Sequence, residues 1–197
     1  MFQIFLGYLL IFFSFKVGGI DLSPNFVGYF LIFLGLSNNL NKSYKFSFAK
    51  PLSLVLSIFS LIGLVAPIVN KIFNLTLLDS NSILSKVIFM IFDLAVVVLT
   101  YLILAGYRDI EKNEKVNMKM FPAFILFIIN SVVLIALNVL VFFISISLVE
   151  NISMVLIMVN SITNFVFAIY MYLMYRNYNI EIYNKNSKAD EWYSKNK

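Results

Sequence analysis

Two polar residues, Asp93 and Thr100, stand seven positions apart inside a long apolar stretch of the sequence. Seven residues make two helical turns, so both side chains lie on nearly the same face of a helix. Asparagines follow in the next two apolar stretches, at Asn138, Asn160 and Asn164. A carboxylate, a hydroxyl and amides at similar depth predict a polar cavity for a cation, a proton or a small polar solute. The alternative is a structural Asp93 that Asn and Thr donors satisfy.

Other kinds of chemistry find no support in the residue types. The chain contains neither Cys nor His, which excludes thiol nucleophiles, histidine bases and Cys/His zinc sites. It also lacks a P-loop, a Gly-x-Ser-x-Gly elbow and a glycine-rich dinucleotide motif. We therefore expect no enzyme and no cofactor.

The elements that must position these polar residues are six apolar stretches. The composition is 61% hydrophobic and 13% charged, with a mean hydropathy of +0.90, which is too apolar for a soluble domain of this length. The stretches lie at about 2–17, 24–40, 51–70, 83–107, 121–148 and 153–175. They predict an all-α, polytopic membrane bundle of about six transmembrane helices over 1–176, followed by a polar cytoplasmic tail over 177–197. The first two stretches are short, and a re-entrant hairpin is the alternative for them.

The basic residues predict the orientation of the bundle. Twelve of the 15 Lys and Arg residues fall on alternate connections or after the last stretch. The other three are Lys16, Lys71 and Lys86. The positive-inside rule then places both termini in the cytoplasm. Because the basic residues flank membrane segments, the net charge of +5 does not indicate a nucleic-acid partner.

Small residues recur at helical spacing and favour close packing of the first two stretches. Gly7 is seven residues before Ser14, and Gly28 is seven before Gly35. The run GYLLIF at 7–12 also recurs as GYFLIF at 28–33. We interpret these positions as helix contacts, where a missing side chain lets two backbones approach.

One stretch resembles a known group of proteins. The run IDLSPNFVGYFLI at 20–32 is similar to the opening hairpin of uncharacterised small membrane proteins of low-GC Gram-positive bacteria. That resemblance implies a bacterial cytoplasmic membrane and no defined activity. The six-helix size also resembles the substrate-binding S-components of energy-coupling-factor importers, in architecture only.

The sequence thus predicts a multi-pass membrane protein that transports or binds a small polar solute or cation. Its partners would be the lipid bilayer and, if it acts as a subunit, another membrane protein or an ATPase. The alternative is a non-transporting interaction protein, of the bacteriocin-immunity type or a regulatory subunit.

Overall fold

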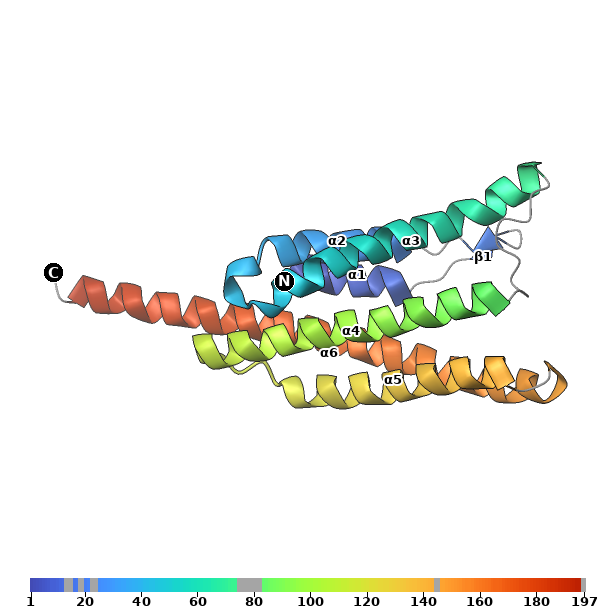
Figure 1. Ribbon diagram of the computed structural model, residues 1–197. Helices are drawn as coiled ribbons and strands as arrows, with labels where there is room; N and C mark the ends of the chain where they lie inside the picture. Colours follow the sequence, from blue (N-terminus) through green and yellow to red (C-terminus); the bar gives the residue numbers. More distant parts are fainter. Residues whose placement is uncertain (13–15, 18–19, 22–24, 74–82, 144–145, 196–197) are drawn as a thin grey trace.

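The computed structural model describes residues 1–12, 16–17, 20–21, 25–73, 83–143 and 146–195 (Figure 1). In this part of the chain the structure is helical, apart from one short ribbon. The α-helices are α1 (Phe2–Phe12), α2 (Asn25–Ser37), α3 (Lys45–Phe73), α4 (Ile83–Glu114), α5 (Met120–Phe143) and α6 (Ile146–Lys195). The ribbon pairs β1 (Lys16–Val17) with β2 (Ile20–Asp21), and the 3-10 turn η1 (Leu40–Lys42) precedes α3. The prediction of a helical bundle is confirmed.

The helices form a closed ring. Each helix packs against the next one in chain order, and α6 returns to pack against α1. The interior holds fully buried apolar side chains such as Ile4, Ile32 and Ile103. Large apolar side chains also cover the outside, Val132 and Ile162 among them, at 61% and 64% exposure. A helix that is apolar on all sides is typical of a membrane environment.

Three helical segments are long and apolar enough to cross a membrane. They are Lys45–Val65, Lys86–Glu114 and Met158–Lys188. The other apolar helices are shorter: Phe2–Phe12, Asn25–Ser37 and Met120–Ala136. At about 1.5 Å per residue, α1 and α2 are roughly 17 and 20 Å long, against a hydrocarbon core of about 30 Å. Membrane association is therefore supported, and the crossing of all six stretches stays a prediction.

Glycines hold α1 and α2 together, as the sequence predicts. A Cβ atom on Gly7 would lie 2.5 Å from the Gly28 carbonyl oxygen. A Cβ on Gly28 would lie 2.7 Å from the Gly7 carbonyl oxygen and 2.7 Å from Ile11 Cγ1. A Cβ on Gly35 would meet Ile4 Cγ1 at 2.6 Å. The recurring GY runs therefore face each other, and only glycine permits this distance between the backbones.

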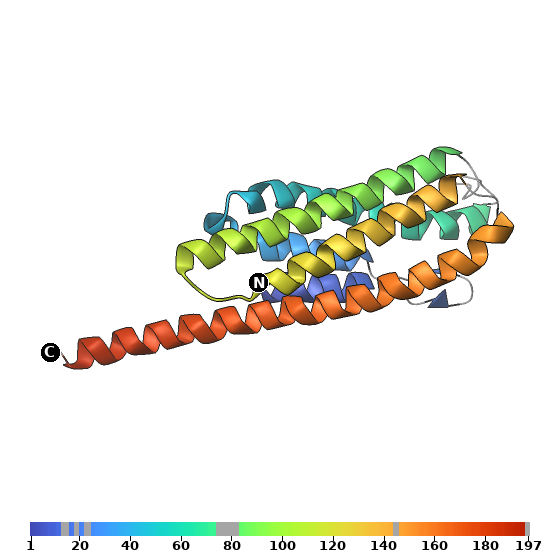
Figure 2. The ribbon, with the colours of Figure 1, turned by 90° about the horizontal axis from the view of Figure 1, so that it is seen from below.

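The last helix extends beyond the sixth apolar stretch. The polar residues predicted to form a tail after residue 177 are helical, and α6 continues through them without a break to Lys195. Its 50 residues correspond to about 75 Å, so it projects past the rest of the bundle (Figure 2). Tyr178 packs in the core, and Glu181 and Lys185 bond to the connection between α4 and α5. These contacts explain why the helix does not end where the apolar stretch ends.

Candidate functional site

The polar face of α4 points into the bundle. Thr100 is 8% exposed and Tyr107 is 4% exposed, while Asp93 is half-buried. The spacing of seven residues therefore marks an inward face, as predicted. Burial increases along this face from Asp93 toward Tyr107.

A hydrogen bond crosses the ring at Thr100. The Tyr8 hydroxyl on α1 donates to Thr100 Oγ1 at 2.9 Å, and the Thr100 hydroxyl donates to the Val96 carbonyl at 2.9 Å. Tyr8 is 3% exposed and Thr100 is 8% exposed, so bulk water does not compete for this hydrogen bond. Both protons are thereby committed, and only oxygen lone pairs remain on these two side chains.

A small cavity of about 30 Å³ adjoins this hydrogen bond. Residues from α1, α2, α4, α5 and α6 line it. Its polar lining comes from Tyr8, Tyr29, Thr100 and Asn130, and aromatic rings form much of the remainder. The Tyr8 ring meets the Phe167 ring edge to face at 5.5 Å. The cavity therefore has a few polar atoms in a lining that is mainly aromatic and aliphatic.

Amide oxygens on α5 and α6 are buried without a hydrogen-bond donor. Within the described part of the chain, Oδ1 of Asn130, Asn160 and Asn164 is enclosed and has no partner. Asn130 precedes the end of α5 by 13 residues and Asn160 follows the start of α6 by 14, so they lie at a similar level of this antiparallel pair. A buried acceptor without a donor costs about 1–3 kcal/mol, which marks these oxygens as candidate ligand atoms.

Asp93 lies beside the cavity, on the side toward the start of α4. It is one helical turn from the lining residue Val96 and two turns, or about 10 Å, from Thr100. The ring of the neighbouring Phe92 packs edge to face at 5.9 Å on the ring of Tyr29, which lines the cavity.

The structure brings together part of the predicted set. Thr100 lines the cavity, and Asp93, Asn160 and Asn164 lie on the same two helices as its lining residues Val96 and Phe167. The side chain of Asn138 lies outside the described residues. Sequence reasoning singled out neither Tyr8 nor Tyr29 as a site residue, although both follow the glycine of a recurring GY run. That recurrence was the available signal, because it places both tyrosines at the same position relative to an interface glycine.

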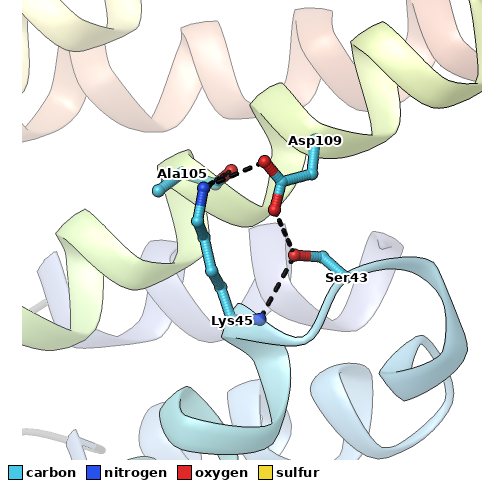
Figure 3. Close-up of polar contacts among 4 residues, drawn as sticks. All are labelled: Ser43, Lys45, Ala105 and Asp109. Carbon is cyan, nitrogen blue, oxygen red and sulfur yellow. Dashed lines mark hydrogen bonds and ion pairs between the residues drawn. The ribbon is translucent and has the colours of Figure 1, made fainter.

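A second polar cluster closes the end of the bundle where α3 begins. Lys45 Nζ lies 2.9 Å from Asp109 Oδ1 and donates to the Ala105 carbonyl at 3.2 Å (Figure 3). The Ser43 hydroxyl donates to Asp109 Oδ2 at 2.7 Å. The mixed-charge residues that follow the fourth apolar stretch belong to α4, which continues through Glu114.

A further bond in this cluster reaches α6. Lys42 donates to the Tyr178 hydroxyl and lies 3.8 Å from Glu114 Oε1. Most of these donors and acceptors bond to one another, although Glu114 Oε2 is buried without a partner among the described residues. The cluster is therefore a structural clasp between η1, α3, α4 and α6.

Comparisons with other proteins add no assignment. Among the described residues, no group of three or more acidic side chains is placed to hold a metal ion. No protein-family model, curated protein or solved structure matches this chain.

Proposed function

We propose that this protein is a multi-pass membrane protein that binds a small polar solute or cation within its helical ring and passes it across the membrane. The observation that carries this proposal is the cavity at Thr100, where buried oxygens face a space enclosed by five helices. A purely structural core would fill such a space with apolar side chains, because unpaired buried oxygens are costly.

The membrane topology in this proposal has about six crossings, with both termini in the cytoplasm. Its support is the exposed apolar surface of the ring and the basic residues at one end. Lys42, Lys45 and Lys185 all bond to residues near the end of α4. Under the positive-inside rule this end faces the cytoplasm of a bacterial cell.

We assign a functional role to the side chain of Asp93. Placing an Asp at the centre of a membrane helix costs about 2.5–3.5 kcal/mol, and such residues usually serve transport or binding. Within this proposal Asp93 neutralises a cation, or orients a polar solute, next to the cavity. Asn160 and Asn164 supply further acceptors from α6.

The test is flux through proteoliposomes that contain the purified protein. Wild-type protein should take up one member of a panel of alkali cations and small polar solutes, and Asp93→Asn should abolish that uptake. Asn179→Ala, on the exposed part of α6, is the matched control and should keep it. Equal uptake by Asp93→Asn and wild type would overturn the role of Asp93.

A second candidate function is an interaction subunit without transport. The observation that favours it is the extension of α6, where Tyr183 and Trp192 are 73% and 62% exposed. Exposed aromatic side chains on a projecting helix are typical of contact sites for other proteins. Affinity purification in mild detergent would then recover a stoichiometric membrane partner, and deletion of residues 180–197 would release it.

A further inference from the structure

The outward-facing side of α4 changes from apolar to basic along one line of residues. Its exposed apolar side chains occur at helical spacing, at Ile91, Leu94, Val98 and Tyr101. Arg108 follows Tyr101 by seven residues, Lys112 follows Arg108 by four, and both are exposed. Residues at these spacings lie on nearly the same face of a helix. The exposed Lys115 directly follows the end of α4, and together these three cations form the basic stripe.

The acidic side chains of the same segment are used within the protein. Each contacts a residue outside α4: Asp109 contacts Ser43 and Lys45, Glu111 accepts from the Met118 N–H, and Glu114 contacts Lys42. Within the described part of the chain, the two ion pairs at this end use Lys42 and Lys45, and neither uses the basic stripe. The positive charge of the stripe is therefore left for a partner outside the chain.

Exposed aromatic side chains mark the same end of the bundle on the two helices that flank α4. Tyr44 and Phe48 lie beside the start of α3, and Phe121 lies at the start of α5. Both helices pack against α4 and begin at the end of the bundle where α4 ends (Figure 1). Aromatic residues are enriched at the boundary between the hydrocarbon core and the lipid headgroups. The outward face of α4 therefore becomes basic near the level of the headgroups.

A phospholipid with an anionic headgroup is complementary to both parts of this face. Its acyl chains can cover the apolar part between Ile91 and Tyr101, and its phosphate can meet the cations that follow. A guanidinium offers paired N–H donors to phosphate oxygens, and an ammonium supplies a point charge on a flexible stem. An acidic protein or a nucleic acid would contact only the basic stripe, whereas a phospholipid contacts the whole face.

Orientation of the chain does not by itself explain this arrangement. The positive-inside rule requires only an excess of Lys and Arg in a cytoplasmic connection, wherever their side chains point. Attraction to the helix dipole favours cations at the carboxyl end of α4 on any face. Neither effect places the cations in line with the apolar side chains or brings the acids into contact with Lys42 and Lys45.

We infer that this face of α4 binds the headgroups of anionic phospholipids in the cytoplasmic leaflet, through Arg108 and Lys112, with Lys115 as a further cation. The inference rests on the membrane insertion and the orientation given in the proposed function. It does not depend on the solute or on Asp93. It names the class of lipid that surrounds this end of the bundle.

The first test titrates the purified protein in neutral detergent with phosphatidylglycerol or with phosphatidylcholine of the same acyl chains. Phosphatidylglycerol should raise the unfolding midpoint in a saturable manner, because a ligand that binds only the folded state stabilises it. Phosphatidylcholine, whose headgroup is zwitterionic, should bind roughly tenfold more weakly. The difference should shrink as NaCl is added, because salt screens exposed charges. Equal affinities for the two lipids would overturn the inference.

Two double variants locate the bound lipid. Arg108→Gln/Lys112→Gln removes two cations from the basic stripe and should weaken phosphatidylglycerol binding about tenfold. Lys188→Gln/Lys195→Gln removes the same charge from the projecting part of α6 and should leave binding unchanged. Equal weakening in both variants would attribute binding to net charge and overturn the assignment to α4. If the α4 variant does not fold, the comparison of the two lipids on wild-type protein still decides.

A competition experiment separates lipid from other anionic partners. Poly-glutamate carries the charge of an acidic protein and has no acyl chains, so it should not displace phosphatidylglycerol at the same concentration of negative charge. Displacement would overturn the inference and assign this surface to an acidic protein.

The outcomes are separable from those for the proposed function. A preference for phosphatidylglycerol without any solute uptake would support the lipid site and reject transport. Uptake that depends on Asp93, together with equal affinity for both lipids, would reject the lipid site and leave the proposed function standing.

Discussion

Two polar regions of this bundle differ in how fully their side-chain oxygen atoms are hydrogen-bonded, although Glu114 Oε2 in the first region is also buried without a partner among the described residues. At the end where α3 begins, Asp109 accepts from Ser43 and Lys45, and Lys42 bonds to Tyr178. In and beside the cavity at Thr100, on α5 and α6, the amide oxygens of Asn130, Asn160 and Asn164 are buried without a donor among the described residues. The first region joins elements to one another, whereas the second keeps acceptors available beside a cavity.

The difference indicates which region can bind a ligand. The side chains of Lys45 and Asp109 are 23% and 25% exposed, so water already screens their interaction. The oxygens near the cavity are shielded from water, so each unpaired acceptor there lowers stability until a ligand or a water binds. Polar residues that reduce stability are expected at functional sites, because a site optimised only for stability would pair or remove them.

The largest effect should come from separating α1 and α2, which would open the cavity region and spare the other end. Gly28→Ala places a methyl group 2.7 Å from the Gly7 carbonyl oxygen. Overpacking of this kind costs about 3 kcal/mol of unfolding free energy. Unfolding of the purified protein in detergent measures the loss. Gly63→Ala is the control, because no atom lies within 4 Å of its new methyl group, and equal losses in both variants would contradict the close contact.

The next effect concerns the hydrogen bond that crosses the ring. Thr100→Val removes the acceptor of the Tyr8 hydroxyl and should cost about 2 kcal/mol, because a buried donor is left without a partner. The same unfolding measurement applies. The double variant Tyr8→Phe/Thr100→Val should recover part of the loss, since it removes both partners. Additive losses would show that the two side chains do not interact.

A third variant should act in the opposite direction. Asn130→Leu replaces an amide whose buried Oδ1 has no donor among the described residues with an apolar side chain of similar size and should raise the unfolding free energy by roughly 1 kcal/mol. The measurement is made in choline chloride, so that no alkali cation contributes. A lower stability than wild type would mean that the Asn130 amide is satisfied in the folded protein.

We expect the smallest loss of unfolding free energy from a change at the end of the bundle where Lys45 pairs with Asp109. Lys45→Met removes the ion pair with Asp109 and should cost at most about 1 kcal/mol, since both side chains are partly exposed. The loss should shrink as salt is added, because salt screens the pair in the wild type. Lys188→Met, on the exposed part of α6, is the control. If Lys45→Met lowered the unfolding free energy as much as Thr100→Val, the two regions would not differ in the energetic weight of their polar contacts.

The sequence predicted the helical bundle and the inward face of α4 because both depend on local pattern. Apolar runs of helical length indicate membrane helices, and a spacing of seven residues keeps Thr100 and Tyr107 on one face. The glycine contacts of α1 and α2 were also predictable, since Gly7, Gly28 and Gly35 recur at helical spacing. The length of α6 was not, because its polar part is held by contacts to the distant residues Lys42 and Asn117.

The sequence by itself determined that this protein has apolar helices, that its charges gather in particular connections and that Asp93 stands among apolar residues. Those properties follow from composition and periodicity along one chain. Only the tertiary structure decided that Tyr8 meets Thr100, 92 positions away, and that Asn130 borders the same cavity. The reason is that a ring of helices brings one residue from each member to a common level. Which residues meet depends on how far each helix is shifted and rotated, and side-chain packing between helices sets both.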